Sequence, residues 1–315
     1  MTERQYTTDH RKDYEDDLDL IELVNALWKG KWIIIAVTFV FAVGSIAYAL
    51  SQPNMYRSEA LLAPAEDSGG MRVPGQLGGL AALAGVNLGG SGGGTKVALA
   101  LEILKSRDFL GRFIEKYDLK VPIMAAKSWD IQSNTLVIDS DIYDEATRTW
   151  VREVKLPLRP EPSLLETHEE FLTMLSVSEG QNSGMVRVAV EHYSPYLAAE
   201  WVRLLVHEVN EEMRKRELEE ATNSIAYLES QLERTSLADV QLMLYSLIEE
   251  QTKTLMLANV RPEYVLITID PAIVPEKRSK PSRAMIVIIG TFIGGLLSAT
   301  FVIMLSMFRR RNAKQ

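Results

Sequence analysis

The chain has 315 residues, 47% of them hydrophobic and 24% charged, and a formal net charge of −8 at pH 7. An acidic chain with no basic domain and no interleaving of basic and aromatic residues is unsuited to binding nucleic acid. Cysteine is absent, which excludes disulfide bonds, thiolate zinc sites and thiol catalysis. Two long uncharged runs with a charged region between them indicate a membrane protein.

The N-terminal region, residues 1–31, is predicted to be a cytoplasmic tail. Its first half is polar and has no apolar periodicity, which is typical of disorder. Apolar residues then recur at helical spacing within Leu18–Lys29, which predicts a short amphipathic helix with Trp28 at the level of the lipid headgroups. An equally open interpretation is that this stretch forms the first turns of the helix that follows.

The first uncharged run, residues 32–50, is about 28 Å long as a helix and is predicted to cross the membrane. Ala47-Tyr48-Ala49 resembles a signal-peptidase site, so cleavage after Ala49 is one interpretation. The length of the run and the long region before it favour an uncleaved membrane anchor.

Residues 51–283 are long enough to fold as a globular unit, and their pattern predicts a mixed α/β domain. Alternating apolar residues indicate strands, and apolar residues at intervals of three and four indicate helices. The predicted strands are 55–63, 131–139, 186–190 and 264–270, and the shorter predicted helices are 95–117, capped by Thr95, and 164–175.

A glycine-rich segment, residues 68–94, interrupts this domain. The adjoining stretch Gly90–Lys96 is similar to a phosphate-binding loop, but that motif requires Gly-Lys followed by Ser or Thr, whereas here Thr95 precedes Lys96. We therefore predict no nucleotide site. The leucines within the segment favour a flexible loop whose apolar patch lies against a neighbouring subunit or the membrane.

The longest predicted element is a helix over about 195–258, with Ser194 as its N-cap and Pro195 in its first turn. Unbroken, it would be about 95 Å long. Its apolar residues follow the 4-3 heptad rhythm of a coiled coil, but the rhythm slips at Thr235 and Ser236. The slip predicts either a local distortion of a coiled coil or a bend between two helices.

A proline-rich collar, residues 270–281, follows the last predicted strand. Pro271, Pro275 and Pro281 withhold N–H donors and favour extended backbone in the residues before them. We predict that the collar is a stiff connection between the outer domain and the membrane. These three prolines are the predicted functional motif.

The second uncharged run, residues 284–308, is predicted to be the second transmembrane helix. Gly290 and Gly294 have the small-xxx-small spacing that lets helices pack closely within a bilayer, and Gly295 lies beside them. Helix flexibility is the alternative role for these glycines. The basic tail, residues 309–315, favours the cytoplasmic side, so both termini are predicted to be cytoplasmic.

No catalytic, cofactor or metal site is predicted. The four histidines, His10, His168, His192 and His207, lack the spacing of metal ligands. No nucleophile elbow or kinase signature occurs, and the paired carboxylates fall on charged helix faces. The chain is expected to act through its shape and assembly.

Several stretches together resemble the Wzz chain-length determinants, or polysaccharide co-polymerases, of Gram-negative inner membranes. Each stretch is weak by itself, and their order and spacing along nearly the whole chain carry the resemblance. They are Asp19–Leu23, Leu27–Trp32, Tyr56–Ala60, Ala100–Arg107, Ser194–Pro195, Met256–Val260 with Tyr264, and Asp270–Ala272 with Pro275–Glu276 and Pro281.

The resemblance implies an α+β membrane protein in which two transmembrane helices bracket a periplasmic α/β base domain with a long, coiled-coil-like helical extension. It also implies a ring-shaped homo-oligomer in the lipid bilayer of the bacterial inner membrane. Such a protein lies beside a membrane polysaccharide polymerase and sets the length of O-antigen or a related surface polysaccharide without forming bonds itself. The nascent polysaccharide is a further candidate partner. Larger members carry a tyrosine-kinase domain after the second span; only residues 309–315 follow it here, so kinase activity in cis is not expected.

Two other classes are alternatives. A two-span membrane sensor with a ligand-binding outer domain would need a cytoplasmic output domain, whereas both predicted tails are short. A periplasmic adaptor of an export system would also carry long coiled-coil helices. Such adaptors usually have one membrane anchor and lipoyl-like halves, which the sequence does not reveal.

Overall fold

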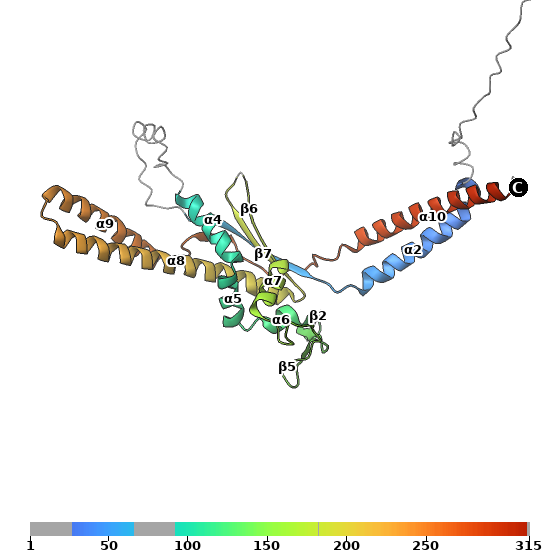
Figure 1. Cartoon of the computed structure of the whole chain (residues 1–315), viewed down its shortest axis with the longest axis horizontal. Helices are drawn as coiled ribbons and strands as arrows, with labels where there is room; N and C mark the ends of the chain where they lie inside the picture. The colour runs from blue at the N-terminus through green and yellow to red at the C-terminus, as the bar shows by residue number, and fades with distance from the viewer. Residues whose placement is uncertain (1–26, 66–91, 182, 314–315) are drawn as a thin grey trace, which may run out of the picture. The chain divides into compact units, whose positions relative to one another are not determined.

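The computed structural model describes residues 27–65, 92–181 and 183–313 (Figure 1). The predicted tail up to residue 26, with most of its amphipathic helix, lies outside these ranges. Most of the glycine-rich segment, up to residue 91, also lies outside them. The predictions for these two segments are therefore not tested by the structure.

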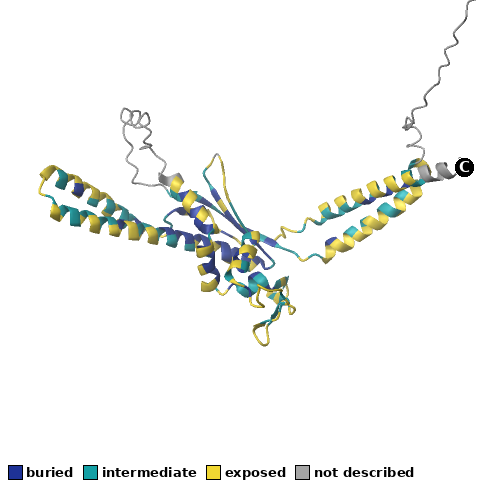
Figure 2. Ribbon diagram, in the orientation of Figure 1, coloured by how far each residue is buried: buried dark blue, intermediate teal, exposed yellow. Residues whose placement is uncertain are grey.

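Two candidate membrane helices form one compact unit, which holds residues 1–52 and 281–315. They are α2 (Lys31–Ser51) and α10 (Arg283–Ala313), and they contain the two uncharged runs. Both helices are long and apolar enough to cross a membrane. Few of their residues are buried (Figure 2), as expected where lipid is the surrounding solvent.

A four-stranded antiparallel sheet lies at the centre of the second unit, residues 53–280. β1 pairs with β7 from Tyr56 opposite His192 to Leu62 opposite Val186, and its other edge pairs with β8. The last strand of this unit therefore lies beside the first. The strands, in their spatial order, are β6 (Leu175–Glu179), β7 (Val186–His192), β1 (Tyr56–Pro64) and β8 (Leu266–Asp270).

The core of this unit lies between one face of the sheet and the helices that pack on it (Figure 2). The alternation of side chains along a strand explains which residues of β1 are buried, namely Tyr56, Ser58, Ala60 and Leu62. Helix α8 (Pro195–Arg234) packs on β1 and β7. Its Trp201 is 1% exposed, and the indole ring lies 5.6 Å from the ring of Phe171. The mixed α and β fold class that the sequence predicts is confirmed.

Four shorter helices complete the core: α4 (Gly92–Lys105), α5 (Arg107–Lys116), α6 (Lys120–Met124) and α7 (Leu164–Met174). The prediction of one helix over 95–117 is wrong, because Ser106 divides it. The Oγ of Ser106 accepts a hydrogen bond from the backbone N–H of Phe109 at 3.3 Å and caps α5. Thr95, the predicted cap, lies inside α4.

Two small hairpins lie between α6 and α7. β2 (Ala126–Asp130) pairs with β3 (Thr135–Ile138), and β4 (Tyr143–Asp144) pairs with β5 (Thr149–Trp150). The predicted strand 131–139 begins too early, because residues 131–134 form the turn of the first hairpin. Asp130 stabilises that turn by accepting a hydrogen bond from the Oγ of Ser133 at 2.6 Å.

The helix predicted over about 195–258 is two helices, so the prediction of one continuous helix is wrong. α8 starts as predicted, with the Oγ of Ser194 accepting a hydrogen bond from the N–H of Leu197 at 3.4 Å. It ends at Arg234, and α9 (Ala238–Val260) runs back along it (Figure 1). The alternative interpretation, a bend between two helices, is closer to the observed helical hairpin.

The chain reverses where the heptad rhythm slips. Thr235 and Leu237 both have extended backbone, which neither helix can continue through. Folding back brings the apolar stripes of the two helices together and buries Ala221 and Leu244. One straight helix would leave these side chains in water, so burial favours the hairpin.

His192, at the end of β7, is a fully buried polar residue. Its Nδ1 accepts a hydrogen bond from the N–H of Ser194 at 3.1 Å, and its Nε2 lies 3.0 Å from the carbonyl oxygen of Pro122. This pair of contacts fits a neutral imidazole with its proton on Nε2. Burial lowers the pKa of His192, and the two backbone hydrogen bonds offset only part of that effect.

We predict that mild acid destabilises the protein through His192. Below the ordinary histidine pKa of about 6.5, the unfolded chain takes up a proton that the folded chain does not bind. The free energy of unfolding then falls by about 1.4 kcal/mol per pH unit until the lowered pKa is reached. Urea unfolding followed by tryptophan fluorescence between about pH 7 and about pH 5 measures this slope.

The matched control is a second histidine. His192→Gln, which cannot titrate, should lose the slope, whereas His207→Gln, on the exposed side of α8, should keep it. If His192→Gln keeps the full slope, the buried imidazole is not its source.

Candidate functional site

The collar is held against the α/β domain. Between β8 and α10 the backbone forms neither helix nor paired strand apart from a bridge at Lys280. Ala272 is 5% exposed and belongs to the hydrophobic core. The Oγ of Ser58, on β1, donates a hydrogen bond to the carbonyl oxygen of Ile273 at 2.7 Å. The collar therefore packs on β1 and is not a free linker.

A backbone bridge joins the end of the collar to Met55, the residue just before β1. The N–H of Met55 donates to the carbonyl oxygen of Lys280 at 3.0 Å, and its carbonyl oxygen accepts from the N–H of Ser279 at 2.8 Å. Met55 follows α2, which ends at Ser51, and Lys280 precedes α10, which begins at Arg283. This Met55–Lys280 bridge thus ties together the two connections that lead to the candidate membrane helices.

An ion pair adds to the bridge. The Nζ of Lys280 lies 2.5 Å from the Oε2 of Glu191, and Nη1 of Arg57 lies 3.8 Å from the other carboxylate oxygen. Glu191 is 8% exposed, so water contributes little to the stability of its charge. The two cations stabilise that charge instead. Because the side chain of Lys280 is largely exposed, water screens the pair and limits its strength.

The three predicted prolines do not converge on one site. Pro271 is exposed and lines a pocket beside α8, and Pro275 is half-buried. Pro281 belongs to the unit of the helix pair. They share only their position along the collar, and their functional role stays a prediction.

Two of the three predicted glycines lie where α10 meets α2. A Cβ atom on Gly290 would lie 2.8 Å from the Cβ of Ser45, and one on Gly294 would lie 2.7 Å from the Cγ of Phe41. Both distances are too short for real Cβ atoms, so the helices approach this closely only because these residues are glycine. A Cβ on Gly295 would make an ordinary contact at 3.8 Å.

Sequence reasoning missed two further contacts of the helix pair. A Cβ on Gly30 would lie 3.0 Å from Cγ2 of Val302. The hydroxyl oxygens of Thr38 and Ser298 lie 3.5 Å apart, and Ser298 is buried. Small and hydroxyl-bearing residues within or beside an apolar run were the signal that could have found both contacts.

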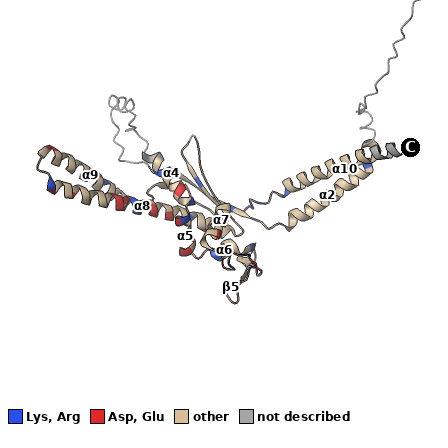
Figure 3. Ribbon diagram, viewed as in Figure 1, with Lys and Arg blue, Asp and Glu red and all other residues tan. Residues whose placement is uncertain are grey.

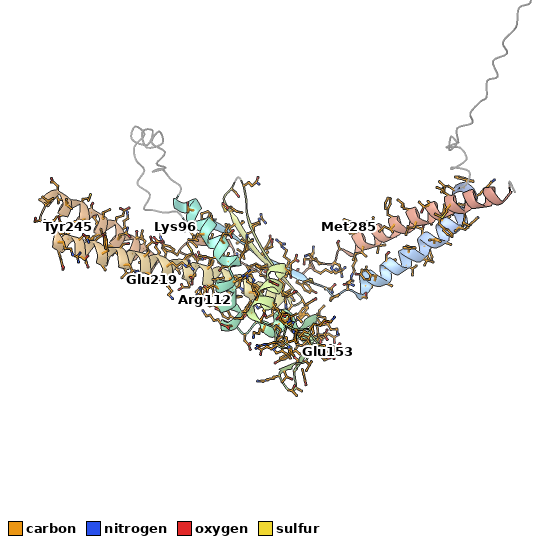
Figure 4. All side chains as sticks on the ribbon, in the orientation of Figure 1. Lys96, Arg112, Glu153, Glu219, Tyr245 and Met285 are labelled. Atoms are coloured by element: carbon orange, nitrogen blue, oxygen red, sulfur yellow. The ribbon has the colours of Figure 1, made fainter. Side chains whose placement is uncertain are left out.

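Charged residues gather where α4 and α5 lie beside α8 (Figure 3). The Nζ of Lys96 lies 3.3 Å from Glu217, and Nη1 of Arg112 lies 3.0 Å from Glu212. Figure 4 labels Lys96 on α4 and Arg112 on α5. Burial alone would raise the pKa of Glu212, but hydrogen bonds from Arg112 and Arg216 hold it below its ordinary value. Lys96, the last residue of the stretch that is similar to a phosphate-binding loop, is therefore a helical residue paired with a carboxylate.

The described residues hold no group of three or more His, Cys, Asp or Glu side chains that could bind a metal ion. What the arrangement offers is a set of packing contacts. The Met55–Lys280 bridge fixes the collar on the domain, and Gly290 and Gly294 fix the spacing of the helix pair.

Two family models match the chain. Residues 16–117 match the model described as Wzz, chain length determinant protein. Residues 229–307 match the model described as GNVR, G-rich domain on putative tyrosine kinase. The first match runs through α2 and β1 to the end of α5, and the second covers α9, β8, the collar and most of α10.

The chain is also similar to proteins whose names refer to tyrosine kinases and polysaccharide. The tyrosine-protein kinase etk of Escherichia coli strain K12, and likewise that of strain O157:H7, is 27% identical over 120 residues. The match covers 38% of this chain and only 15% of the length of these relatives. A full-length bacterial polysaccharide co-polymerase matches 94% of this chain and all of its own, at 14% identity and a TM-score of 0.40. A fragment of WzzB, the polysaccharide co-polymerase from Salmonella Typhimurium, matches 72% of this chain and all of its own, at 13% identity and a TM-score of 0.32.

The match over residues 16–117, which include the candidate membrane helix α2, gives the class of this region as a chain length determinant domain. About a third of the chain, residues 16–117, thus matches the Wzz chain length determinant family. The resemblance that the sequence motifs indicate is confirmed.

We predict that bulk at Gly294 separates the helix pair. Leucine there would overlap Phe41, whereas a Cβ on Gly44 would meet no heavy atom within 4 Å. The chain has no cysteine, so Thr38→Cys with Ser298→Cys gives a clean disulfide reporter between α2 and α10. Oxidative crosslinking of this pair should fall several-fold with Gly294→Leu and stay unchanged with Gly44→Leu. Equal crosslinking in both variants would show that the close approach at Gly294 does not matter.

Proposed function

We propose that the protein regulates the chain length of a surface polysaccharide, the O-antigen of lipopolysaccharide or a related polymer. It does so without catalysing bond formation, as an oligomeric scaffold that acts on a membrane polymerase. The observation that carries this proposal is the match of residues 16–117 to the chain length determinant family. The etk relatives are matched over 15% of their length, so their kinase activity is not part of the proposal.

The proposed location is the bacterial inner membrane, with both termini in the cytoplasm and the domain of residues 51–283 in the periplasm. Two uncharged helices at the ends of the domain support a two-pass arrangement. We take residues 32–50 and 284–308 as the parts that cross the hydrocarbon core. The excess of Lys and Arg beside the ends of these spans supports the orientation.

The proposed partners are further copies of the chain, arranged in a ring, and the polymerase, with the nascent polysaccharide beside them. A scaffold of this kind needs a link between its outer domain and its membrane helices. The Met55–Lys280 bridge supports such a link, because a displacement of β1 must act on the residues that lead into α10. Pro271, Pro275 and Pro281 add stiffness to the same segment, since each fixes its own φ angle.

The glycines of α10 have a proposed role in the same mechanism. Gly290 and Gly294 hold α10 close to α2, and Gly295 beside them makes only an ordinary contact. A pair of helices fixed at one spacing would present a constant surface to a polymerase in the bilayer.

Deletion of the gene tests the proposed function. We expect polymer to be made still, but with scattered lengths and no modal band on a gel of the surface polysaccharide, because the regulator and not the polymerase is removed. Complementation with the intact gene should restore the modal band. An unchanged ladder would contradict the proposal and would favour the sensor or adaptor alternatives.

A further inference from the structure

A small pocket lies beside the collar, between α8 and the chain that leads from α9 through β8 to Pro271. Its volume is about 200 Å³. Part of its wall is apolar, with Pro262 and Pro271 among its lining residues, and its polar side chains include Arg203, His207 and Glu263. Neither the family match nor the sequence motifs assign this pocket a ligand.

Asn210 fixes the wall of the pocket. Its Oδ1 accepts hydrogen bonds from the N–H groups of Val265 and Leu266 at 2.9 and 3.0 Å, and its Nδ2 donates to the carbonyl oxygen of Leu266 at 3.0 Å. Asn210 is 2% exposed. Since these bonds tie the start of β8 to α8, the two sides of the pocket are held at a fixed separation.

The donors of the pocket lie on one face of α8. Arg203 and His207 are four residues apart, so their side chains project from neighbouring positions one turn apart. The Nε of Arg203 donates to the carbonyl oxygen of Ala199 at 3.3 Å, and its two Nη groups have no hydrogen-bond partner among the described residues. Among the residues that the structure describes, the ring of His207 makes no hydrogen bond.

The acceptor of the pocket is the carboxylate of Glu263, which Thr268 holds in place by hydrogen bonds. Oε1 of Glu263 accepts hydrogen bonds from the N–H of Thr268 at 3.2 Å and from its hydroxyl at 2.6 Å. These bonds orient the group and leave its second oxygen without a hydrogen-bond donor among the described residues. The pocket therefore offers donors from α8 and an oriented acceptor beside an apolar wall.

This combination selects one class of ligand. A simple anion would be repelled by the carboxylate of Glu263, and a wholly apolar group would leave the polar side chains without partners. A sugar ring has hydroxyl groups that both donate and accept, and C–H faces that pack on apolar walls such as proline rings. The volume admits one such ring.

We propose that this pocket binds one pyranose ring of the polysaccharide. Arg203 and His207 donate to its hydroxyls, Glu263 accepts from a hydroxyl, and Pro271 packs against a C–H face. The inference rests on the proposed function, because that function brings polysaccharide to the protein. Since Pro271 belongs to the collar, an occupied pocket would place polymer in contact with the segment that leads to α10.

Saturation-transfer NMR on the full chain in lipid nanodiscs tests the proposal. The probes are methyl glycosides of glucose, galactose and mannose, and N-acetylglucosamine; inorganic phosphate, the anion, has no C–H protons and is followed by phosphorus-31 NMR. We expect at least one sugar to bind, with an affinity about tenfold weaker in Arg203→Ala and in Glu263→Gln, since each loses a charge-assisted hydrogen bond. Lys215→Ala, on the exposed side of α8 outside the pocket, is the matched control and should bind as the wild type does.

Three outcomes would overturn the proposal. The wild type binds none of the four sugars, or the pocket variants bind as well as Lys215→Ala does, or phosphate binds more tightly than every sugar with the same dependence on Arg203. Glu263→Gln keeps an acceptor for Thr268, so its thermal unfolding separates lost binding from lost folding. If gene deletion abolishes the modal band while the pocket variants bind normally, this inference fails and the proposed function stands.

Discussion

The structure depends on one constraint, the Met55–Lys280 bridge. Strand β1 pairs with β7 from Tyr56 to Leu62, and its other edge pairs with β8 from Leu61 to Pro64, so hydrogen bonds hold it from end to end. The bridge extends that fixed frame to the end of the collar, and the ion pair between Lys280 and Glu191 adds a second attachment. In the proposed function, the α/β domain acts on α2 and α10 through these contacts and the covalent connections beside them.

Helix α8 brings the remaining parts of the domain onto this frame. Its Trp201 fills the core, while Asn210 holds the start of β8 through three hydrogen bonds and donates a fourth to the carbonyl oxygen of Val206 within α8. Buried polar groups such as Asn210 and His192 stabilise only the arrangement that satisfies all of their hydrogen bonds. They therefore specify how the helices meet the sheet, whereas an apolar side chain requires only that it be buried.

Much of the fold could be predicted because its signals are local. Ser194 and Pro195 begin α8 as their chemistry requires, and the alternation in β1 and β7 is visible in the residues themselves. The helical hairpin was harder, because the break at Thr235 contains no Pro or Gly and is stable only when α9 packs on α8. The Met55–Lys280 bridge and the pocket beside the collar join residues far apart in the chain, so no periodicity could indicate them.

The central claim is that a stiff collar carries the geometry of the outer domain to α10. The most direct test replaces Pro271, Pro275 and Pro281 by alanine and measures the polysaccharide ladder and the amount of protein in the membrane, with Pro160→Ala as control. The account predicts a broadened or shifted modal length at unchanged protein level. The double variant of Pro275 and Pro281, which spares the pocket, should behave in the same way. A ladder identical to that of the wild type would contradict the claim.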